Sequence, residues 1–488
     1  MFDEIKLNKE YKYFDGCRWV HSAEYRKIEI KNPVDDSVVG CIQNCTGDEI
    51  IRVVETLKEG QKRWASKTID ERATILDKAA DIIESQVDFI GNILCREIAK
   101  PLNDAKEEIL RSAQITRFTS HSVRTIEGQY LQSGVFYNTK NNKQCLVKRE
   151  PLGIVLAISP FNYPVNLSCS KIAPALASGN AVILKPPLEG AISAFHLVQC
   201  FLEAGVPGGV IATVTGESKK IGDILVPHED ISCISFTGST STGEIIARKA
   251  GIKKLLFELG GNGTAIILDD CDLEKTINDV IPGAFSYSGQ RCTAIKRLLV
   301  QDKIAGRAIA LMKKKIEKLS VGSPLKNNDI TPLVGLHHAE FVENLINGAK
   351  RGGAKIITGG RRKGNLIEPT LIDKVDPGMS IANVEQFGPV LPVIRFKKID
   401  EAIEITNTTK YGLQSCVFTQ DIDKAFYIAE RILTGTMNIN CAPSRGPDTF
   451  PFLGVKKSGI GVQGIKDSIL EMTREKVIVI KTSKNLSK

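Results

Sequence analysis

The apolar run GIVLAIS, residues 153–159, sets the architecture of this chain. It has the length of one strand, and such runs are typical of strands buried on both faces of a parallel sheet. Strand-like runs and helical periodicity alternate after it, which predicts an open, doubly wound sheet of the Rossmann kind. The further strands are expected at residues 181–184, 210–214 and 233–236, and the helices at residues 173–177, 192–204 and 221–225.

Helical periodicity precedes this block, and a second alternating block follows it. Asp70 is expected to cap one of the early helices, because a short acidic side chain can accept the free N–H groups of the first turn. The predicted fold class is therefore α/β, with two α/β blocks in succession. The early helices are expected at residues 48–64, 70–90 and 104–127, and the strands of the second block at residues 265–268, 297–300, 392–395 and 415–418.

Two β segments lie outside these blocks. Residues 129–150 alternate between apolar and polar side chains around Asn141 and Asn142, which predicts a hairpin. Residues 476–481 predict a final strand with nothing after it to pair with. A lone hairpin is marginally stable in water and a tail strand leaves an open edge. We therefore expect these segments to pair with another subunit, in a homodimer or a homotetramer.

The composition is ordinary for a globular protein, with 42% hydrophobic and 25% charged residues. The net charge is +9, but the basic residues are spread along the chain, so no nucleic-acid partner is expected. No apolar run has the length of a membrane span, and the N-terminal residues do not resemble a secretory signal. Twelve cysteines without a CxxC pair predict reduced thiols, no metal site and a cytoplasmic location.

One cysteine has the surroundings of a nucleophile. Cys292 follows Gly289 in the stretch SYSGQRCT, residues 286–293, and a glycine lets the backbone approach a ligand closely. Glu258 stands between an apolar run and two glycines, and Asn162 stands between two prolines. The residues alone leave other interpretations open: a buried, inert thiol, an exposed carboxylate and a turn residue.

These motifs resemble those of the aldehyde dehydrogenase superfamily. GQRC at residues 289–292 is similar to that family's cysteine signature, and FELGGN at residues 257–262 is similar to its glutamate signature. The resemblance covers nearly the whole chain and implies an NAD(P)-dependent aldehyde dehydrogenase. The other motifs in the family's order are PFNYP at residues 160–164, KPP at 185–187, FTGS at 236–239 and EQFGP at 385–389.

The resemblance implies a role for each catalytic residue. The Cys292 thiolate adds to the aldehyde carbon and forms a thiohemiacetal, whose oxyanion accepts hydrogen bonds from the Asn162 amide and the Cys292 N–H. Oxidation then produces a thioester. Glu258 activates the water that hydrolyses this thioester, as a general base.

The cofactor site is also assigned through the resemblance. Gly238 and Ser239 open a helix after a predicted strand, and a helix N-terminus suits a pyrophosphate. In the family, residues matching Lys185 and Glu385 bind the two riboses, and the residue matching Phe387 packs on the nicotinamide ring. Pro160 is counted with these cofactor-binding residues.

Leu188 bears on the choice of cofactor. NAD-preferring relatives often have a glutamate at this position, which binds the ribose 2′-hydroxyl. The absence of a carboxylate there removes repulsion against a 2′-phosphate, and Lys185 attracts it. The sequence therefore favours NADP, with NAD as the alternative.

Three further segments resemble the non-phosphorylating glyceraldehyde-3-phosphate dehydrogenases of that family. They contain Arg111, Arg291 and Arg445, which by this resemblance hold the substrate phosphate, with Tyr163 as a further donor. Guanidinium groups are always charged and fit phosphate oxygens well. The implied reaction is the irreversible oxidation of glyceraldehyde 3-phosphate to 3-phosphoglycerate. The segments are EILRSA at residues 108–113, GAFSYSGQRCTA at 283–294 and RGPDTFPF at 445–452.

Three alternatives stay open. One is another small aldehyde, such as lactaldehyde or a semialdehyde, although these substrates need no arginine cluster. Another is transfer of the acyl group to coenzyme A, against which Glu258 argues. The last is a catalytically silent binding protein of the same family.

The resemblance also implies a division into domains. A Rossmann-like cofactor domain precedes an α/β catalytic domain, and a small β extension serves oligomerisation. The expected dinucleotide-binding domain is residues 1–128 and 150–258, the catalytic domain residues 259–458, and the oligomerisation elements residues 129–149 and 473–488.

Overall fold

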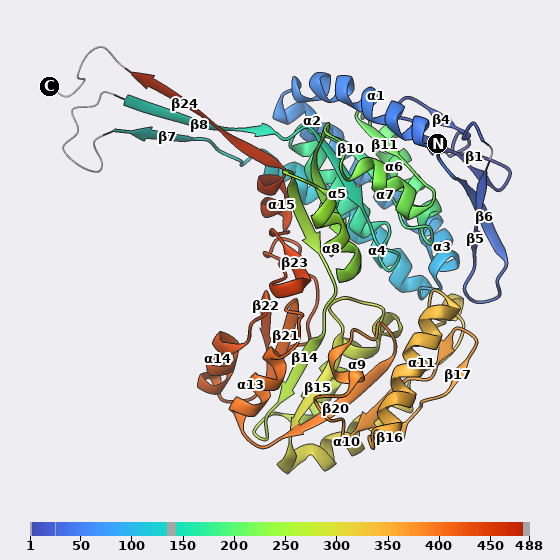
Figure 1. Cartoon of the computed structure of the whole chain (residues 1–488), viewed down its shortest axis with the longest axis vertical. Coiled ribbons are helices and arrows are strands. Elements are labelled where there is room, and N and C mark those ends of the chain that lie inside the picture. Colours follow the sequence, from blue (N-terminus) through green and yellow to red (C-terminus); the bar gives the residue numbers. More distant parts are fainter. Residues whose placement is uncertain (1, 25, 134–142, 482–488) are drawn as a thin grey trace.

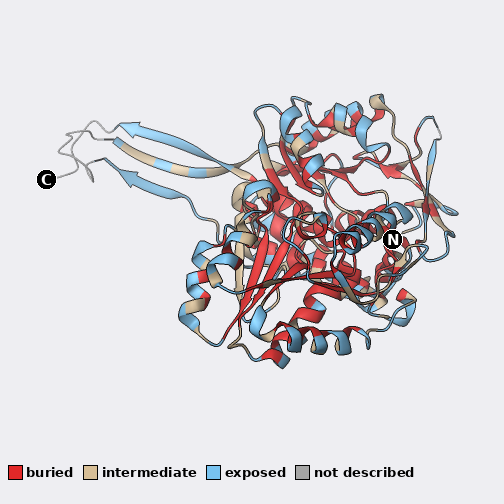
Figure 2. Ribbon diagram, turned by 60° about the horizontal axis from the view of Figure 1, so that its bottom comes forward, coloured by how far each residue is buried: buried red, intermediate tan, exposed pale blue. Residues whose placement is uncertain are grey.

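The computed structural model describes residues 2–24, 26–133 and 143–481. Two α/β units lie one above the other, and three strands form an arm that projects from the side of the molecule (Figure 1). Buried residues fill both units, whereas the arm is mostly exposed (Figure 2). Within these described ranges, no helix is long and apolar enough to cross a lipid bilayer.

The run at residues 153–159 forms β9 (Ile154–Ile158), inside a six-stranded sheet. β9 pairs in parallel with β10 (Ala181–Lys185) and β12 (Ile231–Thr237). Its side chains enter two hydrophobic cores in alternation, because helices cover both faces of the sheet. The doubly wound sheet is thus confirmed. The other strands are β11 (Ile211–Thr213) and two that the sequence did not predict, β13 (Lys254–Glu258) and the antiparallel β23 (Gly459–Ile460).

Helices flank this sheet on both faces. The helix expected at residues 173–177 starts earlier, at Asn166, and the other helices of this block match their expected positions closely. The helices of this unit are α1 (Gly47–Ala65), α2 (Ile69–Ser85), α3 (Val87–Ile98), α4 (Leu102–Val123), α5 (Asn166–Ala177), α6 (Ala191–Glu203), α7 (Ser218–Leu225), α8 (Thr240–Lys249) and α15 (Ile465–Glu471).

The helix expected at residues 70–90 is two helices, α2 and α3, which meet at Gln86. The expectation that Asp70 caps this helix is wrong, because Thr68 is the N-cap. The Thr68 hydroxyl accepts the Glu71 N–H, and the Glu71 carboxylate accepts the Thr68 N–H, which forms a capping box. Asp70 lies in the first turn and pairs with Arg124 of α4 at 3.0 Å.

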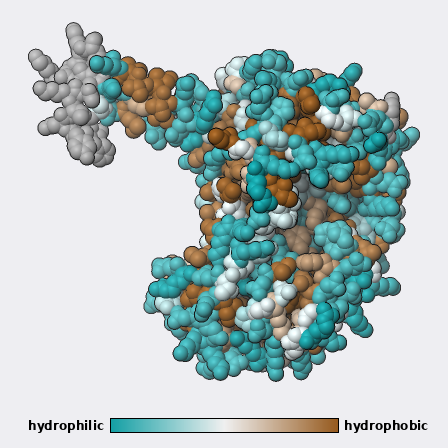
Figure 3. All heavy atoms as spheres, in the orientation of Figure 1, coloured by the Kyte–Doolittle hydropathy of each residue, from teal (hydrophilic) through white to brown (hydrophobic). Residues whose placement is uncertain are grey.

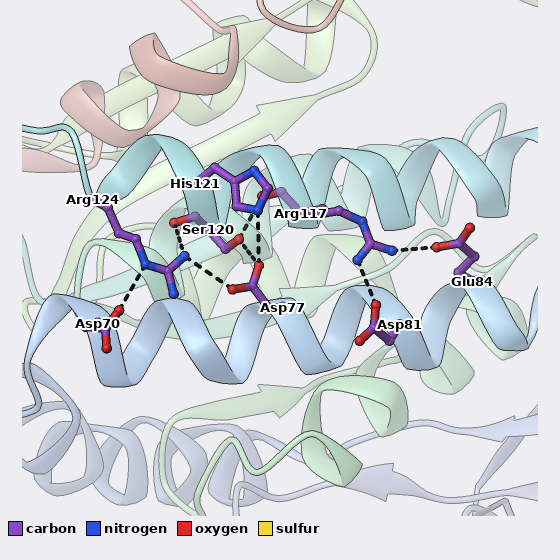
Figure 4. A network of polar contacts seen from close by, with 8 residues as sticks. All are labelled: Asp70, Asp77, Asp81, Glu84, Arg117, Ser120, His121 and Arg124. Atoms are coloured by element: carbon purple, nitrogen blue, oxygen red, sulfur yellow. Dashed lines mark hydrogen bonds and ion pairs between the residues drawn. The ribbon is translucent and has the colours of Figure 1, made fainter.

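Charged side chains along α2 pair with side chains at the C-terminal end of α4 (Figure 4). Arg117 donates to Asp81 at 2.7 Å and to Glu84 at 2.5 Å. The carboxylates of these pairs are largely exposed, so each pair contributes little to stability. The buried apolar faces of the two helices carry the packing.

A seven-stranded sheet forms the second unit, and it contains all four strands predicted there. Its order is β16 (Lys355–Thr358), β19 (Thr370–Asp373), β20 (Val390–Phe396), β15 (Ile295–Gln301), β14 (Gly263–Ile267), β21 (Gln414–Phe418) and β22 (Thr436–Ile439), and all but β16 run parallel. Its helices are α9 (Leu273–Phe285), α10 (Asp302–Ile316), α11 (Leu336–Arg351), α12 (Ser380–Asn383), α13 (Ile399–Asn407) and α14 (Ile422–Arg431).

The arm consists of β7 (Gln129–Gln132), β8 (Lys143–Pro151) and β24 (Thr473–Lys481). β7 and β8 pair as the predicted hairpin, whose turn at Asn141 and Asn142 lies outside the described residues. The final strand pairs with an earlier strand of the same chain, which the sequence did not predict. β24 runs antiparallel to β8 over its full length, from Thr473 opposite Pro151 to Lys481 opposite Lys143.

Short strands complete the fold. They bring the N-terminal residues and one long loop of the second unit into regular structure. They are β1 (Lys6–Leu7), β2 (Glu10–Tyr11), β3 (Tyr13–Phe14), β4 (Trp19–Val20), β5 (Lys27–Lys31), β6 (Val38–Gln43), β17 (Arg362–Lys363) and β18 (Leu366–Ile367). The domain boundaries given above stay a prediction.

Candidate active site

A cavity of about 930 Å³ lies between the two units. Its wall includes the carboxyl ends of β9, β10 and β12, which is where open α/β sheets bind ligands. Cys292 and Asn162 line it together with all the residues expected to bind the cofactor. Those residues are Pro160, Lys185, Leu188, Gly238, Ser239, Glu385 and Phe387.

Cys292 lies half-buried in the loop between a 3₁₀ turn, η1 (Ser286–Gly289), and β15. Tyr287 and Ser288 have left-handed backbone angles, with φ of 50° and 52°. Such angles cost energy for residues with side chains. Two hydrogen bonds of the Ser288 hydroxyl offset this conformational energy. The hydroxyl donates to the carbonyl of Thr331 at 2.8 Å and accepts the Thr331 N–H at 2.9 Å. The turn thereby presents Cys292 to the cavity.

The electrostatic surroundings of Cys292 favour the neutral thiol. Burial raises the pKa of Cys292 to about 12, and the carboxylates of Glu258 and Glu385 act in the same direction. Arg445 and Lys296 oppose this rise. The thiol is therefore protonated at neutral pH in this state, and formation of the thiolate requires a change in its surroundings.

Asn162 follows β9 and is buried beside the cysteine loop. Its Nδ2 donates to the carbonyl of Gln290 at 2.8 Å, two residues before Cys292. The backbone carbonyl of Asn162 accepts a hydrogen bond from the Lys100 Nζ at 2.7 Å. The side-chain amide is thus held next to the loop that carries the thiol.

Glu258 ends β13 and is only 4% exposed, which excludes the interpretation as a surface carboxylate. Its Oε2 accepts hydrogen bonds from Thr237 and from Arg445, both at 2.9 Å. Among the described residues, its Oε1 is buried and has no hydrogen-bond partner. A buried carboxylate oxygen without a partner marks a place where a water or substrate atom can bind.

The arginines are paired in ways that the sequence did not predict. Arg445 forms an ion pair with Glu258, and the two side chains are 15% and 5% exposed. Arg111 donates to both carboxylate oxygens of Asp448, at 2.7 and 2.8 Å, and to the carbonyl of Arg445. Arg291 donates to the carbonyls of residues 282 and 283. The carboxylates of Glu258 and Asp448 therefore already balance the charges of Arg445 and Arg111.

Tyr163 lies close to this group of arginines. Burial raises its pKa to about 12, and the charges of Arg291 and Arg111 oppose the rise. A second cavity, of about 310 Å³, has Arg445 and Asp448 in its wall, together with Phe450. Of the four predicted phosphate-binding residues, Arg445 is in the wall of this second cavity, and none is in the wall of the large cavity.

Lys185 ends β10, where its Nζ donates to the hydroxyl of Ser218 at 2.9 Å. Burial lowers the pKa of Lys185 to about 8, although the charge of Glu189 opposes this. Ser218 and Lys219 also line the large cavity, and the sequence analysis missed them. The signal was present, because these residues follow a predicted strand at the same edge of the sheet.

Glu385 and Phe387 lie on a loop of the second unit. The Glu385 Oε1 accepts the Gly261 N–H at 3.0 Å, and burial raises the pKa of Glu385 against the opposing charge of Lys296. The Lys296 Nζ lies 4.8 Å from the centre of the Phe387 ring. Gln386 Nε2 donates to the carbonyl of Lys296 at 3.2 Å and so anchors the loop.

The large cavity has the features of a dinucleotide site. Ser239 is the N-cap of α8, and its hydroxyl accepts the Thr242 N–H. The wall also contains buried polar atoms that lack partners among the described residues, His338 Nδ1 and Gln386 Oε1. A long cavity with a helix N-terminus, a buried lysine and unpaired polar atoms fits a phosphorylated dinucleotide. Across the described ranges, no cluster of ligating side chains could hold a metal ion.

Comparison with known proteins agrees with this geometry. Residues 19–478 match the model of the aldehyde dehydrogenase family. The NADP-dependent glyceraldehyde-3-phosphate dehydrogenase of Pisum sativum is 46% identical over 479 residues, which cover 98% of this chain and 96% of that protein. The enzyme of the same name from Streptococcus equinus is also 46% identical, over 98% of this chain and 100% of that protein.

A solved structure is also similar to this chain over nearly its full length. The crystal structure of the NADP-dependent glyceraldehyde-3-phosphate dehydrogenase of Bacillus halodurans, complexed with NADP, has a TM-score of 0.95 to this chain and 46% sequence identity. The match covers 98% of this chain and 100% of that one. The chain therefore belongs to the aldehyde dehydrogenase family.

Proposed function

We propose that this protein oxidises glyceraldehyde 3-phosphate to 3-phosphoglycerate with NADP, through a thioester on Cys292. The arginine cluster beside Glu258 and Tyr163 carries the choice of substrate, because an aldehyde without an anionic group needs no such cluster. The names of relatives that are 46% identical over 98% of the chain support the same substrate.

Once the proton of the Cys292 thiol has been released to solvent, the thiolate sulfur forms a bond to the aldehyde carbon, and the carbonyl oxygen becomes an oxyanion. The side-chain amide of Asn162 and the backbone N–H of Cys292 donate to this oxygen; loss of one such donor costs about 100- to 1,000-fold in rate. NADP, when bound in the large cavity, supplies the hydride acceptor of the oxidation. A water molecule then attacks the thioester, and the acyl–sulfur bond breaks to release the acid and the thiol.

Glu258 takes the proton from this water. The unpaired Oε1 is the free acceptor for that step, while Oε2 is held by Thr237 and Arg445. A phosphate dianion competes with Glu258 for the Arg445 guanidinium. Binding of substrate therefore weakens the Arg445–Glu258 pair.

The preference for NADP rests on Lys185, Ser218 and Lys219, which place two amines and a hydroxyl at one end of the large cavity. Leu188 lies in the same wall, where a carboxylate would repel a 2′-phosphate. The structure of the 46% identical Bacillus halodurans protein complexed with NADP supports this choice.

We further propose that the arm assembles copies of this chain into a dimer or tetramer, in a cytoplasmic setting. Val477 and Val479 are 54% and 58% exposed on β24, and hydrophobic residues gather along the arm (Figure 3). β7 and β24 are both edge strands, which can pair with a strand of another subunit.

An assay panel tests the proposed function. The purified protein is incubated with glyceraldehyde 3-phosphate, glyceraldehyde, lactaldehyde or a semialdehyde, each with NADP or NAD, and the reduced cofactor is followed by absorbance. We expect the highest kcat/KM for glyceraldehyde 3-phosphate with NADP, without added inorganic phosphate or coenzyme A. A requirement for either addition would contradict the hydrolytic step, and equal rates with plain glyceraldehyde would contradict the phosphate site.

A further inference from the structure

A lysine that the mechanism above does not use is fully buried next to the active site. Lys100 lies between α3 and α4, and its side chain has no exposed surface. Its ammonium group forms an ion pair with Glu108 of α4 and donates to the Asn162 carbonyl at 2.7 Å. A buried charge is costly unless it is paired and hydrogen-bonded. Both conditions are met here, and both partners of the ammonium group lie beside the active site.

Glu108 holds the other end of the same loop. Its Oε1 accepts the N–H groups of Val165 at 2.9 Å and of Asn166 at 3.1 Å, while Oε2 faces Lys100. The segment from Asn162 to Asn166 is thus held at its first carbonyl by Lys100 and at its last amides by Glu108. Lys100 and Glu108 are both far from this segment in the sequence.

Lys100 also contacts the loop that carries the nucleophile. Its Nζ lies 3.5 Å from the centre of the Tyr163 ring and 4.6 Å from the centre of the Tyr287 ring. Tyr287 belongs to the left-handed turn before Cys292. A hydrogen bond from the Asn162 side-chain amide to the Gln290 carbonyl also joins the Asn162 loop to the Cys292 loop. The ammonium group therefore lies between the oxyanion donor and the nucleophile loop.

We propose that Lys100 is a positioning residue, which holds the Asn162 amide in the orientation required for donation to the oxyanion on Cys292. A carboxylate, a carbonyl and two aromatic faces surround it, and an ammonium group satisfies all of them at once. A neutral side chain of similar length leaves the Glu108 Oε2 and the Asn162 carbonyl without the ammonium group, so the loop loses its fixed position at Asn162. This inference rests on the proposed roles of Asn162 and Cys292, but not on the identity of the aldehyde.

The test compares Lys100→Met, Asn162→Ala and the double variant, with glyceraldehyde 3-phosphate and with propionaldehyde. We expect Lys100→Met to lower kcat about 10- to 100-fold for both aldehydes, a part of the effect of losing an oxyanion donor. KM for NADP should change less than about twofold, because Lys100 does not line the cofactor cavity. The double variant should be no slower than Asn162→Ala, since Lys100 acts through Asn162.

Arg72→Met is the matched control for a purely structural role. Arg72 is also a buried cation of the first unit, and it donates to the carbonyls of Ala177 and Lys67, away from the active site. It should lower the thermal midpoint by an amount similar to that for Lys100→Met and leave kcat unchanged. If kcat falls equally in both variants, or if the losses from Lys100→Met and Asn162→Ala multiply, the proposal is wrong.

Glu108→Gln covers the case in which Lys100→Met does not fold. The amide keeps the shape of the carboxylate but withdraws the charge that holds Lys100. The same loss of kcat and the same lack of additivity with Asn162→Ala are expected, and multiplied losses would overturn the proposal. Should the wild-type protein reject glyceraldehyde 3-phosphate, the proposed substrate fails, while the propionaldehyde measurements still decide the role of Lys100.

Discussion

Cys292 has a protonated thiol in this state, although its proposed role is that of a nucleophile. Burial and the nearby carboxylates raise its pKa to about 12, and Arg445 is one of the two cations that oppose them. Arg445 is also the partner of Glu258. Nucleophile and base thus share one guanidinium group in their surroundings, which the substrate phosphate also binds in our proposal.

Replacement of Cys292 by serine should reduce turnover by several orders of magnitude, because a hydroxyl is a far weaker nucleophile than a thiolate at neutral pH. Formation of NADPH from glyceraldehyde 3-phosphate measures this. Cys17→Ser is the control, since Cys17 is an exposed thiol that does not line the large cavity, and it should keep full activity. Substantial turnover by Cys292→Ser would place the nucleophile elsewhere.

Arg445→Ala should separate phosphorylated from plain substrates. Loss of a hydrogen bond between charged groups costs about 1.5–3 kcal/mol, so kcat/KM for glyceraldehyde 3-phosphate should fall about 10- to 100-fold more than kcat/KM for glyceraldehyde. Both substrates lose some rate, because Glu258 loses its partner. Arg361→Ala, at an exposed surface arginine, should leave the ratio unchanged. Equal losses for the two substrates in Arg445→Ala would exclude a phosphate contact.

The affinity for NADP should depend on pH through Lys185. Burial lowers the pKa of Lys185 to about 8, so its ammonium group is charged below that pH and loses its charge as the pH rises through it. KM for NADP should therefore rise above about pH 8, because the attraction to the 2′-phosphate is lost. NAD serves as the internal control and should show no such rise. A parallel change of KM for both cofactors would mean that Lys185 does not contact the 2′-phosphate.

At the scale of single elements, the helix ends depended on contacts that local pattern does not reveal. α5 begins at Asn166 rather than near residue 173, because Glu108 of another helix accepts the amides of Val165 and Asn166. By contrast, the start of α2 is encoded locally, in the capping box of Thr68 and Glu71. The TxxE pattern of Thr68 and Glu71 is the sequence signature of such a box, and it predicts the helix start better than Asp70 does.

Thr68→Ala should therefore destabilise the first unit by about 1 kcal/mol, which is typical for loss of an N-cap side chain. Thermal unfolding followed by circular dichroism checks this through a lower midpoint. Asp70→Ala is the comparison, since Asp70 contributes only an exposed pair with Arg124, and its effect should be clearly smaller. A larger loss from Asp70→Ala would show that the cap assignment is wrong.

At the scale of the whole molecule, the exposed apolar surface of the arm is not explained by a single chain. It projects from the body (Figure 1), and its apolar side chains are exposed along β24. Exposed apolar strands at a sheet edge favour association. In the single chain, β24 and β7 both remain edges, although β8 joins them.

Val477→Asp combined with Val479→Asp should shift the protein to a smaller assembly, because the charges would be buried on association. Sedimentation velocity measures the mass in solution. Ile252→Asp is the matched control, since Ile252 is fully exposed on the body and away from the arm, and its assembly should match that of the wild type. An unchanged mass for the arm variant would remove the arm from the interface.

Local periodicity and short motifs were enough to predict the α/β class, the parallel strands and the candidate nucleophile. The run at residues 153–159 predicts β9 without reference to any other segment, and GQRC places Cys292 in a signature. The tertiary structure alone decided the partners of the site residues. Arg445 and Glu258 are 187 positions apart, and β24 finds β8 across most of the chain. Such pairings depend on which surfaces the fold brings together, and no local pattern encodes that.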